Sequence, residues 1–182
     1  MKKSVIFEIT ISGVMAALAI VLDRFGSINV GVKITLYGLP LMLVGIMFGV
    51  KIGFLTGLAS GIVIQLTSPY GVGPTSIFWA LAPIAWGTIS ALMYKVFKKA
   101  NIWISISLTV LITSLTANIL NTCAMYMDSL LVKDSYYTLS KILLEWPPRI
   151  LAAFVSMIPY TILLVLITYR LRFINNENDS KK

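Results

Sequence analysis

Long apolar runs limit what this chain can fold into more than any other feature. Hydrophobic residues make up 58% of the 182 residues and charged residues only 12%, a balance that a soluble core of this size does not need. A helix that crosses a membrane needs about 20 predominantly apolar residues. The sequence therefore predicts an all-α integral membrane protein, a compact bundle of six transmembrane helices at residues 5–23, 34–50, 52–67, 76–97, 102–127 and 146–170.

The distribution of basic residues predicts the orientation of the bundle. Cytoplasmic loops of membrane proteins carry an excess of Lys and Arg. With six spans and a cytoplasmic N-terminus, the C-terminus is cytoplasmic as well. The inner side then holds ten basic residues, namely Lys2, Lys3, Lys51, Lys95, Lys98, Lys99, Arg170, Arg172, Lys181 and Lys182. The outer side holds five, namely Arg24, Lys33, Lys133, Lys141 and Arg149. This bias explains the net charge of +8 without a nucleic-acid partner.

The domain organisation is simple. No linker or low-complexity segment divides the apolar part of the chain, so residues 1–174 are predicted to form a single six-helix transmembrane domain. Residues 175–182, NNENDSKK, have the composition of a disordered cytoplasmic tail.

Small residues recur at helical spacing in two places. Gly45, Gly49, Gly53, Gly57 and Gly61 follow one another at every fourth position, and small residues at this spacing let helix backbones approach closely in lipid. They predict a tightly packed helical hairpin with its turn at Val50 and Lys51.

A second small-residue stripe lies on the first helix. It consists of Ser12-x-x-x-Ala16 and Gly13-x-x-x-Ala17. Such a stripe packs against another helix, and the spacing alone leaves open whether that helix belongs to this chain or to a partner protein.

Polar and aromatic residues from distant parts of the sequence are predicted to converge at the outer end of the bundle. A single Arg, Trp or Tyr at a helix end is commonly an interfacial anchor, but several guanidinium groups beside flat aromatic rings suit a planar anion. Pro147 and Pro148 predict the start of the sixth helix, which places the next residue in its first turn. The candidate ligand-binding residues are Arg24, Lys33, Tyr70, Trp79, Asn118, Asn121, Trp146 and Arg149.

Catalytic chemistry finds little support in the residue types present. The chain has no histidine, its only cysteine is Cys123, and no phosphate-binding Gly-Lys-Ser/Thr loop is found, so we predict no enzyme activity, no metal and no cofactor. Ion-coupled transporters usually carry intramembrane acids and internal repeats. Glu8 stands alone in its helix and no repeat is found, so transport must be powered by another protein.

Several stretches resemble the substrate-binding S component of energy-coupling factor (ECF) vitamin transporters. They are SGVMAALAIVLDRF, the RFGSI that ends the first helix, the glycine-spaced second and third helices, and PPRILAAFVSMIPYTILL. The resemblance covers residues 8–170 and is closest to the folate-type members, in which an Arg-Phe-x-Ser-Ile stretch follows the first helix. Those members have a Phe-Pro-x-Gly-x-Tyr-like run before the fourth helix, where this chain has SPYGVG at residues 68–73. Pantothenate or another vitamin precursor therefore stays open as the substrate.

The resemblance implies a multi-pass protein of a prokaryotic plasma membrane that captures a vitamin, folate or a related anion, at its outer face. It also implies docking on a shared transmembrane coupling subunit that carries two ATPase subunits, through an alanine-x-x-x-alanine stripe on the first helix. Gly13 and Ala17 stand at the two stripe positions here, and Ser12 and Ala16 form the neighbouring row. The alternatives are a self-sufficient small-molecule carrier, an intramembrane enzyme and a structural membrane subunit.

Overall fold

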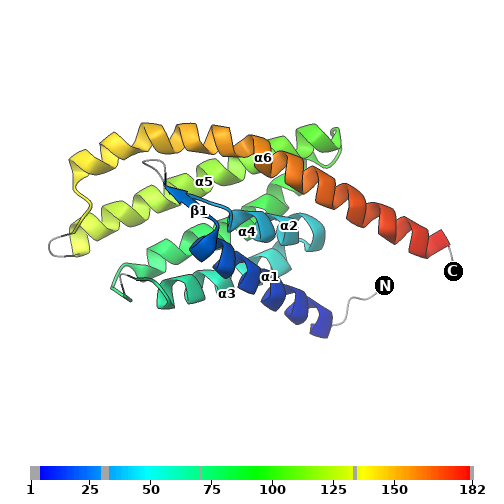
Figure 1. Ribbon diagram of the computed structural model, residues 1–182, viewed down its shortest axis with the longest axis horizontal. Coiled ribbons are helices and arrows are strands. Elements are labelled where there is room, and N and C mark those ends of the chain that lie inside the picture. Colours follow the sequence, from blue (N-terminus) through cyan, green and yellow to red (C-terminus); the bar gives the residue numbers. More distant parts are fainter. Residues whose placement is uncertain (1–4, 30–32, 70, 133–134, 181–182) are drawn as a thin grey trace.

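The computed structural model describes residues 5–29, 33–69, 71–132 and 135–180, without the side chains of 27–35 and 171–180. Within these ranges the chain forms six helices and one two-stranded sheet (Figure 1). The elements are α1 (Val5–Phe25), β1 (Ser27–Asn29), β2 (Lys33–Thr35), α2 (Gly38–Phe48), α3 (Val50–Leu66), α4 (Ser76–Phe97), α5 (Ile102–Leu131) and α6 (Leu139–Ser180). The predicted bundle of six helices is confirmed.

The helices differ in their reach across a membrane. Four of them, α1, α4, α5 and α6, are long and apolar enough to cross it, whereas α2 has 11 residues and α3 has 17. At 1.5 Å per residue, α2 spans about 16 Å, roughly half of a 30 Å hydrocarbon core. The antiparallel hairpin β1–β2, which pairs Ser27 with Thr35 and Asn29 with Lys33, precedes α2. Residues 34 and 35 were predicted to begin the second helix, but they belong to this hairpin, in which they satisfy backbone hydrogen bonds, and α2 begins only at Gly38.

The core of the bundle is built around α2. Eight of its 11 residues are buried, as expected for a helix that is apolar on every side. Met42, Leu43 and Ile46 pack in one cluster with Ile106 and Val110 of α5. The same cluster includes Tyr160, Leu164 and Val165 of α6. The short helix is therefore enclosed by the long ones.

The glycine row brings α3 against α4. A Cβ atom added at Gly57 would lie 2.6 Å from the carbonyl oxygen of Pro83, and one at Gly61 would lie 2.9 Å from that of Ala80. At Gly53 an added Cβ would meet the backbone of Gly87 more closely still. α2 and α3 form the predicted hairpin, in which an added Cβ at Gly53 would lie 3.1 Å from Cα of Gly45, but the glycine row lies closer to α4 than to the hairpin partner. The turn lies at Gly49, where φ is +90°. Only glycine adopts this conformation at little cost, so the chain reverses just before Val50.

The predicted start of the sixth helix is wrong. α6 begins at Leu139, and Pro147 and Pro148 lie inside it. Proline removes one backbone hydrogen bond from a helix interior and kinks it, but an apolar segment in lipid gains so much from helical hydrogen bonding that the helix continues. Figure 1 shows α6 as one long, bent helix along the whole bundle.

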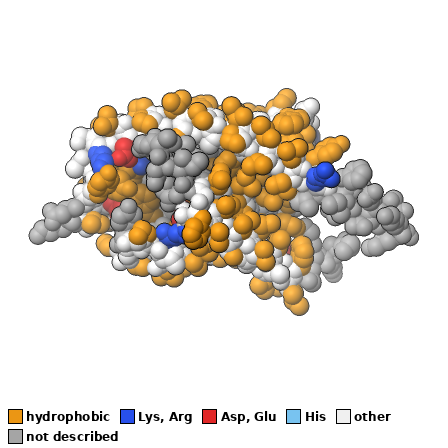
Figure 2. Space-filling model, viewed as in Figure 1, with side chains coloured by type: hydrophobic (Ala, Val, Ile, Leu, Met, Phe, Trp, Pro, Cys, Tyr) orange, Lys and Arg blue, Asp and Glu red, His pale blue; other side chains and the backbone are white. Residues whose placement is uncertain are grey.

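The two ends of the bundle hold different connections between the helices. The start of α1 and the end of α6 lie at one end, here called the proximal end, together with the α2–α3 turn and the end of α4 (Figure 1). The distal end holds the α3–α4 and α5–α6 connections. Figure 2 shows hydrophobic side chains over much of one face and basic side chains mainly toward its ends. The backbone is helical to Ser180, and the division into a domain of residues 1–174 and a tail stays a prediction.

Candidate functional site

Arg24 joins the ends of two helices at the distal end. It lies in the last turn of α1, and its Nη2 donates to the carbonyl oxygen of Ile64 at 2.9 Å and to Oγ1 of Thr67 at 2.8 Å. Its Nε lies 4.0 Å from the carboxylate of buried Asp23. A cation at a helix C-terminus interacts favourably with the last carbonyl groups. Arg24 therefore holds α1 against the end of α3.

Trp79 connects α4 with the distal part of α5 and the segment that follows it. Its Nε1 donates to Oδ2 of Asp128 at 3.0 Å, and its ring lies 5.9 Å from the ring of Tyr137, measured between centroids. Trp79 is half-buried. An aromatic face and a carboxylate thus lie together at the distal end.

Arg149 connects α6 with α5. Its Nη2 donates to Oε2 of Glu145 at 2.9 Å, and its Nη1 contacts the sulfur of buried Met125. The side chain of Arg149 is 16% exposed. This guanidinium group is largely removed from solvent, and a carboxylate one helical turn away partly neutralises it.

One face of α5 brings several of these groups together. Asn118, Asn121, Met125 and Asp128 are spaced by three or four residues, so they form one stripe along the distal half of the helix. Trp79 meets this stripe at Asp128 and Arg149 meets it at Met125. The structure therefore brings Trp79 and Arg149 to neighbouring turns of the same helix face.

We call these four residues the α5 stripe. Its two asparagines are half-buried. The amide nitrogen of Asn118 donates to the carbonyl oxygen of Ser114 at 3.1 Å, within its own helix. Such a bond leaves the amide oxygen of Asn118 as an acceptor. A hydrogen-bond acceptor is thus present on the same face of α5 that Arg149 and Trp79 contact.

Two of the other predicted site residues lie wholly or partly outside the described residues, and a third is exposed on α6. Lys33 lies on β2, and its side chain is outside the described residues, as is Tyr70 entirely. Trp146 is 47% exposed on α6, as expected of an aromatic residue at a membrane interface. Among the described residues, no cluster of His, Cys, Asp or Glu side chains could hold a metal ion.

The residues that hold the candidate groups in place were not predicted from the sequence. Asp128 lies seven residues after Asn121, and Glu145 lies four residues before Arg149. The second relation is a favourable helical ion-pair spacing, which was hidden because the sixth helix was predicted to begin after Glu145. Thr67, the partner of Arg24, carries no such signal.

The structure divides the predicted docking stripe of α1 between two faces. Ser12 and Ala16 are 7% and 4% exposed and lie inside the bundle. Gly13 and Ala17 are exposed, and an added Cβ at Gly13 would meet no atom within 4 Å. The Gly13–Ala17 row is therefore available to a partner helix.

Comparisons with known proteins agree with this architecture. The family model for the ECF transporter, substrate-specific component, matches residues 7–173. Among solved structures, the chain is similar to a crystal structure of FolT bound with folic acid, with 23% sequence identity, a TM-score of 0.55 and 88% of each chain covered. At this identity the likeness concerns the fold. No curated protein sequence matches the chain.

The family match spans nearly all of the six-helix bundle, from α1 into α6. It agrees with the four helices that are long and apolar enough to cross a membrane. The chain is a membrane protein and a substrate-binding subunit of a transporter, not an enzyme. It belongs to the family of substrate-specific components of ECF transporters.

Proposed function

We propose that this chain binds folate or a related anionic vitamin at its distal end. The observation that carries the proposal is the meeting of Trp79 and Arg149 on neighbouring turns of the α5 stripe. The fold likeness to a folic-acid-bound FolT supports a substrate of the same kind. A planar heterocycle with carboxylate groups needs a flat apolar surface, amide groups and cations, and this end of the bundle supplies all three.

Each group has a distinct role in the proposed site. Trp79 stacks on the heterocycle, and Asn118 and Asn121 hydrogen-bond to its polar edge. Arg149 and Arg24 bind the carboxylates, because a guanidinium group can hold a carboxylate with two parallel hydrogen bonds. Lys33, Tyr70 and Trp146 complete the predicted set at the same end.

The orientation and partners form the second part of the proposal. The proximal end faces the cytoplasm of a prokaryotic cell and the distal end faces outward, in agreement with the ten-to-five excess of basic residues on the inner side. The exposed Gly13–Ala17 row docks on a transmembrane coupling subunit that carries two ATPase subunits. ATP hydrolysis then releases the vitamin inside.

Isothermal titration calorimetry of the purified chain with a vitamin panel tests the proposed substrate. We expect folate to bind with a dissociation constant near 1 nM, about −12 kcal/mol, and to raise the thermal unfolding temperature by mass action. Pantothenate as the preferred ligand would contradict the folate assignment. Sustained ATP-independent accumulation by the chain alone in liposomes would show a self-sufficient carrier instead.

A further inference from the structure

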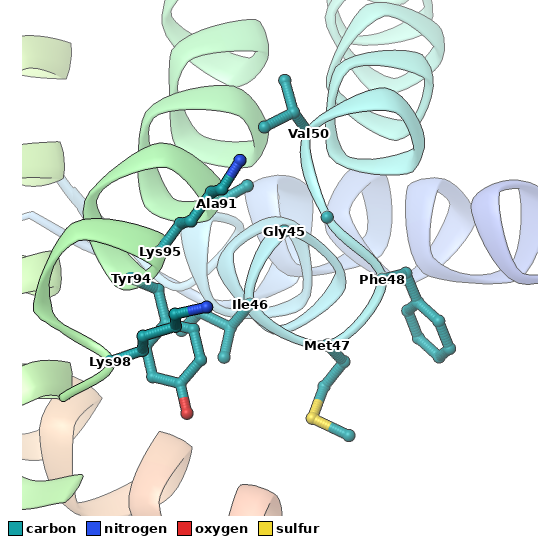
Figure 3. A pocket seen from close by; sticks show the side chains of 10 residues that line it. Gly45, Ile46, Met47, Phe48, Val50, Ala91, Tyr94, Lys95 and Lys98 are labelled. Carbon is teal, nitrogen blue, oxygen red and sulfur yellow. The ribbon is translucent and has the colours of Figure 1, made fainter.

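A depression at the proximal end lies far from the proposed vitamin site. It has a volume of about 430 Å³ and opens between the α2–α3 turn and the end of α4. Ile46, Met47 and Phe48 of α2 line one side, and Lys95 of α4 and Lys98, the residue just after α4, line the other. Figure 3 shows both lysine side chains extending from α4 along this space.

The two lysines differ from Lys51 and Arg149, which are paired with carboxylates. Lys51 donates to Glu8 at 3.1 Å, and Arg149 is paired with Glu145. Within the described ranges, no carboxylate lies within 4.0 Å of Lys95 or Lys98. Two exposed ammonium groups one helical turn apart therefore face this depression without a counter-charge from the described residues.

Apolar surface continues from the depression toward the middle of the bundle. Val50, at the rim, is 37% exposed, and Phe54, one turn further along α3, is 42% exposed. These two residues share one face of α3. A ligand in the depression thus finds positive charge at the membrane interface and an apolar track that leads into the hydrocarbon region.

We propose that this depression binds the phosphate headgroup of an anionic phospholipid, with Lys95 and Lys98 contacting the phosphate and an acyl chain lying along Val50 and Phe54. Basic pockets between transmembrane helices bind such headgroups. The apolar track distinguishes a lipid from free phosphate, which would gain nothing from it. The site is independent of the vitamin site at the distal end.

Native mass spectrometry of the detergent-solubilised full chain tests the proposal, with dioleoylphosphatidylglycerol and dioleoylphosphatidylcholine titrated separately. We expect phosphatidylglycerol to bind more tightly than phosphatidylcholine. K95Q/K98Q should weaken phosphatidylglycerol binding about twenty-fivefold, from roughly a factor of five per lysine. K95R/K98R should retain the wild-type affinity, because it keeps both charges.

The matched control is K99Q/R170Q, which removes two basic charges from the same end outside the depression. We expect it to change phosphatidylglycerol affinity less than twofold. An equal loss in this control would overturn the proposal, since it would show diffuse attraction rather than a site. Equal affinity for the two lipids would also overturn it, as would displacement of phosphatidylglycerol by inorganic phosphate at equimolar concentration. Thermal unfolding measured for every variant verifies that each one is folded.

Discussion

The two rows of small residues on α1 give the sharpest test of how this subunit works. Gly13 and Ala17 lie on the outside of the bundle, and Ser12 and Ala16 lie inside it. We predict that G13L/A17L abolishes vitamin uptake while leaving vitamin binding unchanged. The single variant A16L should instead destabilise the chain itself.

The magnitudes follow from the surroundings of each position. An added Cβ at Gly13 meets no atom within 4 Å, and leucine is favoured over glycine in a helix by up to about 0.8 kcal/mol, so the fold should lose no stability. Overpacking a close helix contact costs about 1–3 kcal/mol per site. Two such sites on the docking face should weaken docking by at least about thirtyfold. Ala16 is 4% exposed, so A16L should lower the unfolding free energy by about 1–3 kcal/mol.

Vitamin binding should not respond to G13L/A17L, because Gly13 lies eleven residues before Arg24, about 16 Å along the helix axis. The assay compares three measurements on each variant: ATP-dependent uptake into proteoliposomes with the coupling and ATPase subunits, the calorimetric dissociation constant of the chain alone, and its thermal unfolding. Loss of binding together with uptake in G13L/A17L would refute the reasoning. So would an A16L chain of wild-type stability.

Two further predictions concern the distal site and the bundle core. R149A and R24A should each weaken vitamin binding by about thirtyfold or more, since removing one partner of a desolvated charged contact costs roughly 2–5 kcal/mol. The control K141A should bind the vitamin as wild type does. Calorimetric affinities equal to wild type for both arginine variants would exclude the anion site. G87A should lower the unfolding free energy by about 1–3 kcal/mol, because its Cβ meets the backbone of Gly53. G73A, with open space around its Cβ, is the control, and equal unfolding temperatures for the two variants would contradict the close helix contact.

The sequence predicted the helices well because lipid leaves few alternatives. Backbone groups must be satisfied within each span, so the apolar runs mark the helices directly, and the fourth was predicted with its observed bounds, Ser76–Phe97. The largest error falls at the distal end. There α6 begins at Leu139, whereas the sequence predicted a start at Trp146. The two prolines suggested that boundary, but helical hydrogen bonding in lipid overrides it.

The candidate site was predictable in its location but not in its contacts. Charge counting and helix order place Arg24, Trp79 and Arg149 at one end. The partner of each residue depends on how each helix is rotated about its own axis. The packing of Gly53 and Gly57 against α4 sets this rotation, and the glycine spacing alone does not tell which helix the glycines face. For the same reason Ser12 and Gly13, adjacent in sequence, could not be assigned to different faces of the bundle.

The internal partners of the candidate residues have a consequence for affinity. Arg149 is 16% exposed and bonded to Glu145, and an unpaired charge this far from solvent would cost several kcal/mol. Glu145 therefore keeps the guanidinium group in place before a ligand arrives. A vitamin carboxylate that binds Arg149 must compete with Glu145, because two carboxylates beside one guanidinium group repel each other. Substituting Glu145 by Gln keeps the hydrogen-bond acceptor but removes that competing charge, so an anionic ligand should bind E145Q more tightly than wild type.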